Sequence, residues 1–161
     1  MLDAFCNWLS NTPFSMVIQD YLWVIPAIQT IHILAIATVM ASILMVDFRL
    51  LGVVGRNQSI PDVAHRFMPW VWGALVVLAC SGSLLIVGEP GRELLSQVFW
   101  AKMILLACAV TVMGTFHVVL NRRSEFWERR RVLGRITAIV SLLLFVGIVA
   151  AGRWIAYMAH G

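Results

Sequence analysis

YLWVIPAIQTIHILAIATVMASILMVD, residues 21–47, is the stretch that decides the fold of this chain. A helix rises about 1.5 Å per residue, and about 20 mostly apolar residues cross the hydrocarbon core of a bilayer. Backbone amides in lipid must be hydrogen-bonded within their own segment, so this stretch is expected to be helical. His32 sits near its middle. An ionisable side chain at that depth normally faces the interior of a helix bundle.

The rest of the chain is similarly apolar. Hydrophobic residues make up 61% of its 161 residues, and the mean hydropathy of +0.88 lies outside the range of soluble domains. We therefore predict an all-α integral membrane four-helix bundle with a single transmembrane domain over residues 1–161. The expected spans cover about residues 21–47, 67–87, 98–120 and 132–157.

A short helix is expected to precede the first span and to lie in the membrane interface. Leu2, Phe5 and Trp8 share one helical face, which is typical of an interfacial helix. Thr12 and Pro13 then form a break followed by a helix start, because Thr caps helices and Pro suits the first helical position.

Two prolines bear on the shape of the spans. Pro26 removes a backbone donor inside the first span and is expected to kink it. Pro69 is expected to mark the opening of the second span, after a turn-rich connector at residues 52–61.

Basic residues predict the orientation of the spans. They cluster in the first and third connectors, at Arg49, Arg56, Arg66, Arg122, Arg123, Arg129, Arg130, Arg131 and Arg135. The positive-inside rule places these connectors in the cytoplasm. We therefore expect a multi-pass protein of the bacterial inner membrane with both termini in the periplasm. This distribution explains the net charge of +4 without nucleic acid as a partner.

Histidines are the main candidates for chemistry. His32 lies near the expected bilayer centre, and His117 lies about 9 Å nearer the cytoplasm at 1.5 Å per residue. Helix tilts of about 20° are ordinary and would be needed to bring the two rings to one level. His65 is interpreted as an interfacial residue, and His160, beside the C-terminus, as solvated. The structural alternative for His32 is a hydrogen bond to a Ser, Thr or carbonyl group of another helix.

Other polar side chains have simpler interpretations. Asp47 and Arg49 close the first span, where they are expected to form a local salt bridge or, as the alternative, to pair with the third connector. Lys102 and Arg153 are expected to extend toward the headgroups, or to pair with the propionates of a haem. The odd number of cysteines, three, lacks metal-type spacing, so the thiols are expected to serve packing.

Four segments resemble an uncharacterised bacterial family of four-span inner-membrane proteins, a domain of unknown function. They are IHILAIATVMASILMVDFRLLG with His32, MPWVWGALVVLACSG with Pro69, FWAKMILL with Lys102, and the end of the third span with His117. The first span is also similar to those of copper-resistance membrane domains and of b-type cytochrome bundles. The resemblance to the latter implies histidines on separate helices that hold a haem.

The leading functional hypothesis is an electron-transfer or redox-accessory subunit that binds haem b. His32 and His117 would be the axial or metal ligands, and Arg153 or Lys102 would meet the propionates. The alternative is a carrier or channel for a metal ion, a proton or a small solute, lined by Gln29, His32, Asp47 and Lys102.

A third hypothesis is a non-catalytic scaffold subunit in which the histidines only join helices. Partners beyond the lipid bilayer would be a second copy of the chain or a redox subunit. The sequence carries no nucleophile elbow, phosphate loop or zinc-helix motif, so an autonomous enzyme is not expected.

Overall fold

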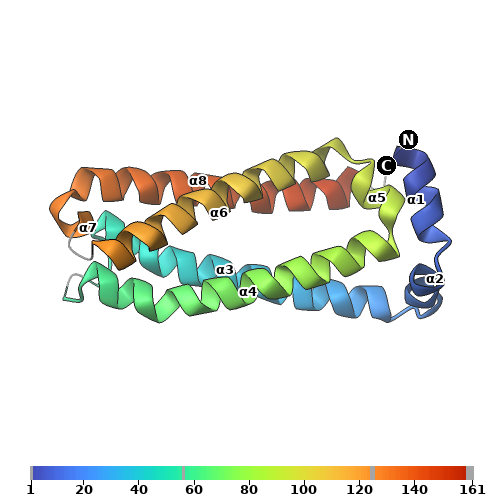
Figure 1. Cartoon of the computed structure of the whole chain (residues 1–161), viewed down its shortest axis with the longest axis horizontal. Coiled ribbons are helices and arrows are strands. Elements are labelled where there is room, and N and C mark those ends of the chain that lie inside the picture. Colours follow the sequence, from blue (N-terminus) through green and yellow to red (C-terminus); the bar gives the residue numbers. More distant parts are fainter. Residues whose placement is uncertain (1, 56, 124–125, 159–161) are drawn as a thin grey trace.

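The computed structural model describes residues 2–55, 57–123 and 126–158, with side chains for all of them except 128 and 153–158. These residues form an elongated bundle of helices, and the described part contains no strand (Figure 1). The long helices are α3 (Val24–Leu51), α4 (Ile60–Gly88), α6 (Gln97–Arg122) and α8 (Arg131–Met158). The short helices are α1 (Leu2–Ser10), α2 (Pro13–Asp20), α5 (Pro90–Leu94) and α7 (Phe126–Arg129). The predicted all-α bundle is confirmed.

The four long helices are long and apolar enough to cross a membrane, with hydropathies of 2.1 to 2.4 over their most apolar windows. Large apolar side chains on their outer faces are exposed, among them Leu34 at 63%, Ile104 at 65% and Leu143 at 67%. Lipid is the solvent that accepts such a surface. The chain is therefore an integral, multi-pass membrane protein.

The long helices pair as two antiparallel hairpins. α3 packs along α4, α6 packs along α8, and α3 also contacts α8. α4 and α6 lie close at the α7 end and diverge toward the α5 end (Figure 1). The hydrophobic core is densest at the α7 end, where Ile43, Met68, Phe116 and Leu120 are each at most 2% exposed.

The connector between α3 and α4 is shorter than expected. Gly52 ends α3 in a left-handed conformation with φ of 76°, which glycine adopts without steric cost. Ser59 then caps α4 by accepting a hydrogen bond from Asp62 N at 3.2 Å. The second long helix thus begins at Ile60, seven residues before the expected start of the second span, and Pro69 lies inside it. Prolines are tolerated within membrane helices because neighbouring groups satisfy the released carbonyl.

The N-terminal region forms two short helices before the first span. Thr12 caps α2 as predicted, accepting a hydrogen bond from Ser15 N at 3.4 Å, and Pro13 is its first residue. Tyr21 ends this helix, so the first span starts at Val24. Pro26 therefore lies in the first turn of α3, where a backbone donor has no intrahelical partner, and the reason to expect a kink is removed.

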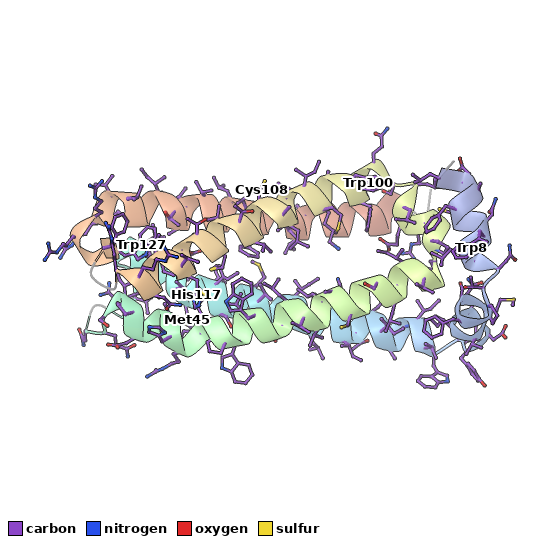
Figure 2. The ribbon with its side chains drawn as sticks, viewed as in Figure 1. Trp8, Met45, Trp100, Cys108, His117 and Trp127 are labelled. Atoms are coloured by element: carbon purple, nitrogen blue, oxygen red, sulfur yellow. The ribbon has the colours of Figure 1, made fainter. Side chains whose placement is uncertain are left out.

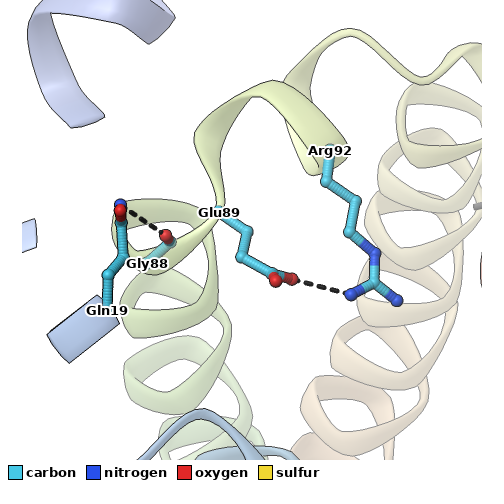
Figure 3. Close-up of polar contacts among 4 residues, drawn as sticks. All are labelled: Gln19, Gly88, Glu89 and Arg92. Atoms are coloured by element: carbon cyan, nitrogen blue, oxygen red, sulfur yellow. Dashed lines mark hydrogen bonds and ion pairs between the residues drawn. The ribbon is translucent and has the colours of Figure 1, made fainter. Parts of the chain in front are cut away.

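Helix α2 is attached to the end of α4 by polar contacts. The Ser15 hydroxyl donates to the Val87 carbonyl at 2.7 Å, and Gln19 Nε2 donates to the Gly88 carbonyl at 3.0 Å (Figure 3). These carbonyls belong to the last turn of α4, where no further helical amide can reach them. The N-terminal segment therefore closes the α5 end of the bundle.

Candidate functional site

His32 joins α3 to α4 through a short hydrogen bond. Its Nδ1 lies 2.7 Å from Ser81 Oγ, and Ser81 is itself buried, at 5% exposure. The interhelical hydrogen bond, which was the structural alternative for this histidine, is therefore present. His32 faces a neighbouring helix as the sequence predicted.

The partners of Ser81 determine the tautomer of the His32 ring. The Ser81 hydroxyl also lies 2.7 Å from the Val77 carbonyl one turn back along α4, and it has only one proton to donate. We assign that proton to the carbonyl, so that Ser81 Oγ accepts from Nδ1–H of His32. The neutral ring then carries its lone pair on Nε2. A hydrogen bond that fixes one ring nitrogen in this way is usual for histidines that act as ligands or bases.

Two further residues shape the surroundings of the His32 ring. Gly82 follows Ser81, and a Cβ atom at that position would lie 3.4 Å from Cε1 of His32. Lys102 of α6 interacts electrostatically with both His32 and Glu93. The His32 ring is thus held by Ser81 of α4, and Lys102 of α6 is a cation that acts on it electrostatically.

Replacing Ser81 by Ala tests the strength of this arrangement. We expect the free energy of unfolding to fall by about 1 kcal/mol, because interhelical hydrogen bonds in membranes average about 0.6 kcal/mol and Nδ1 would lose its partner. Ser83→Ala is the matched control, since the exposed Ser83 hydroxyl bonds only to Ala79 O of its own helix. Denaturation in mixed detergent micelles measures both variants. Equal losses would show that the His32 contact adds nothing to stability.

His117 lies in a different part of the bundle. Its Nε2 accepts a hydrogen bond from Asn121 Nδ2 at 3.1 Å, and its Nδ1 is buried without a hydrogen-bond partner. The ring meets the edge of Trp72 of α4, with 6.2 Å between the ring centroids. Figure 2 places His117 in the half of the bundle that holds Trp127, away from Trp100 at the start of α6.

The two candidate ligands are not brought together. His32 is level with Ser81 of α4, whereas His117 is level with Trp72, nine residues away along the same helix. At 1.5 Å per residue, the rings are separated by about 13 Å along the bundle. Their use as a pair on one iron or metal ion stays a prediction that this arrangement does not favour.

Asp47 is buried, and its expected salt bridge with Arg49 is not formed. The residue is 2% exposed, and its Oδ2 has no hydrogen-bond partner. Arg49 turns instead to the connector, where Nε donates to Gln58 O at 2.7 Å. The expectation of a local salt bridge was wrong, because position 47 of α3 faces α6 and α8 while Arg49 points away from them.

The remaining predicted residues are His65, Arg153 and His160. His65 is exposed near the start of α4, and its interfacial position stays a prediction. The side chain of Arg153 and the whole of His160 lie outside the described residues. No proximity of Arg153 to either histidine can therefore be assigned.

A cavity of about 550 Å³ lies at the α5 end of the bundle, which sequence reasoning missed. Its wall includes Gln19 and a surface ion pair between Arg92 and Glu89, with 2.7 Å between Nη1 and Oε2 (Figure 3). α1 contributes Cys6, whose thiol donates to Pro90 O at 3.6 Å. The turn at residues 88–92 was visible in the sequence as a polar segment. Its contact with the N-terminal helices, which forms the cavity, depends on tertiary structure and could not be read from the sequence.

Among the described side chains, no three His, Cys, Asp or Glu residues gather in a metal-binding group. The three thiols are unpaired. Neither the curated proteins nor the solved structures gave a match to this sequence. The model of a family of unknown function, DUF6644, matches residues 5–158. The sequence predicted membership of an uncharacterised family, and this prediction is confirmed. The chain belongs to the DUF6644 family.

Proposed function

We propose that the protein is an electron-transfer or redox-accessory subunit of the membrane that binds haem b through His32. The observation that carries this proposal is the fixed ring: Ser81 holds Nδ1, and the Nε2 lone pair remains for an iron. Lys102, which interacts electrostatically with His32, would meet a propionate.

The residues present fit a haem held by one histidine, His32, better than one held by the predicted pair. His32 supplies a nitrogen of the right tautomer, whereas His117 lies about 13 Å further along the bundle and its Nε2 is engaged by Asn121. A bound haem b would supply one-electron redox chemistry. In this proposal His32 would hold the group, Ser81 would orient His32, and His117 is given no contact with the group.

The experiment is an absorption spectrum of the purified protein. The chain is expressed with added haem precursor, purified in mild detergent, and measured oxidised and reduced. A Soret band with a sharp α band on reduction supports the proposal. Their absence from a haem-replete preparation, and after addition of haemin, would remove it.

The proposed location is the bacterial inner membrane with both termini in the periplasm. The arginines of the two connectors carry this orientation through the positive-inside rule. A reporter enzyme that is active only in the periplasm should work when fused after residue 161 and fail when inserted at residues 56–57. The reverse pattern of activities would overturn the orientation.

A second candidate function is a carrier or channel for protons, metal ions or a small solute. The cavity of about 550 Å³ at the α5 end favours it, because it gives water access to the bundle near Gln19 and Arg92. Gln29, His32, Lys102 and Asp47 are the proposed path. Flux measured in proteoliposomes tests it, and a flux equal to that of empty liposomes would exclude it.

The scaffold hypothesis has its own support. The His32–Ser81 hydrogen bond joins two helices, which is the whole role this hypothesis requires. It would place the chain beside another subunit or a second copy of itself. Crosslinking in native membranes, followed by mass determination, distinguishes a partner subunit from a homo-oligomer.

A further inference from the structure

Asp47 and Ser141 present two unsatisfied polar groups to one buried space. Asp47 comes from α3 and is 2% exposed, and Ser141 comes from α8 and is 3% exposed. Asp47 Oδ2 and Ser141 Oγ are both buried without a hydrogen-bond partner. Such groups are rare in folded proteins, because each costs about 1–3 kcal/mol when left unpaired. The two side chains also interact with each other, so they form one polar site at which a further hydrogen-bond partner can be placed.

The space between them is the size of one water molecule. Asp47, Ser141 and Thr137 line a cavity of about 10 Å³. A water needs about 10–15 Å³ of such volume and two to four polar partners. Thr137 donates its own hydroxyl proton to Leu133 O at 3.0 Å, which leaves its oxygen free to accept. The cavity thus offers one water three polar contacts.

No cation in the described structure neutralises the Asp47 carboxylate. The rest of the cavity wall consists of apolar side chains, namely Val46, Leu50, Val112, Met113 and Phe116. Arg49, the nearest basic residue in the sequence, is bonded to the connector, and His65 on α4 is exposed. An isolated ionised carboxylate among apolar groups is far more costly than a neutral carboxyl. A proton on Asp47 removes that cost.

We propose that Asp47, Ser141 and Thr137 form a buried proton-binding site that holds one water molecule between α3 and α8. The hydrogen bonds balance in this arrangement: the protonated carboxyl and the Ser141 hydroxyl donate to the water, and the water donates to Thr137 Oγ1. The site lies at the α7 end of the bundle, away from the level of His32, and does not depend on haem binding.

The test is infrared spectroscopy of the full chain in lipid nanodiscs at neutral pH. The wild-type protein is expected to show the C=O stretch of a protonated carboxyl, and Asp47→Asn is expected to lose it. Ser141→Ala should keep the band and shift its frequency, because the carboxyl would lose part of its hydrogen-bond network. Asp62→Asn is the control, since Asp62 is exposed at the start of α4 and its removal should leave the band unchanged.

The wild-type spectrum alone can refute the proposal, so it does not depend on how well the variants fold. Absence of a protonated carboxyl band would overturn it, and so would a band that Ser141→Ala leaves in place at the same frequency. A bound sodium ion would also overturn it. In that case Asp47 would be ionised, and thermal stability would be higher in sodium chloride than in choline chloride at equal concentration, whereas we expect the two to be equal.

Discussion

The His32→Gln variant is expected to lose the b-type absorption bands completely, whereas His117→Gln is expected to keep them. His32 has the tautomer and the anchoring hydrogen bond of a ligand, and Gln offers no nitrogen lone pair for iron. Gln can still bond to Ser81, so the fold should survive. His117 lies at another level and is engaged by Asn121, so its loss should not remove the group.

Spectra of both variants, normalised to protein amount, measure this difference. Circular dichroism of each variant serves as the control for folding. Loss of the bands in both variants, with helix content retained, would support paired ligation and contradict the single-ligand assignment. Retention of the bands in His32→Gln would show that a residue other than His32 binds the haem.

Phe116→Ala is expected to lower the free energy of unfolding by about 3 kcal/mol. Phe116 is 2% exposed and packs against Trp127, with 5.0 Å between the ring centroids. Lipid is as apolar as the core, so transfer out of water contributes little to the loss. An unfilled cavity contributes about 2 kcal/mol, and the aromatic pair contributes about 1 kcal/mol.

Val118→Ala is the matched control on the same helix. Val118 is 50% exposed on the surface of α6, so its truncation removes lipid contact and opens no internal cavity. Denaturation of both variants in mixed micelles gives the comparison. A loss for Phe116→Ala no greater than that for Val118→Ala would mean that the core at the α7 end closes around the missing ring.

Local pattern was sufficient to predict the bundle and the inward position of His32. Long apolar runs identify membrane spans because every residue in the run contributes to the hydropathy. A histidine in the middle of a span is costly in lipid, so its side chain is expected to face the bundle interior. Its partner could not be predicted, because Ser81 is 49 positions away and depends on how α3 and α4 align. For Asp47, a neighbour in the sequence was wrongly taken as its partner. Its neighbour Arg49 suggested a salt bridge, but helix rotation at that level places the two side chains in different environments.

The helix boundaries near residues 20 and 60 could not be predicted from hydropathy. α4 starts seven residues before the expected start of the second span, because Ser59 caps the helix and Pro61 suits its first turn. These are local effects of single residues, which a hydropathy average does not register. The cavity at the α5 end was missed for a different reason. Its lining comes from α1, α2, α3 and the turn after α4, and no sequence period connects these segments.

The attachment of α2 to the end of α4 has a consequence for which substitutions this corner tolerates. Ser15 and Gln19 bind carbonyl oxygens, which every amino acid carries, so position 87 is free to change its side chain without loosening the N-terminal segment. Position 88 has less freedom, because a Cβ atom there would lie 3.1 Å from Ile18 Cγ2, and the Ile18 side chain would have to shift by a few tenths of an ångström. Related chains that keep this corner should therefore vary at 87 and retain a glycine at 88.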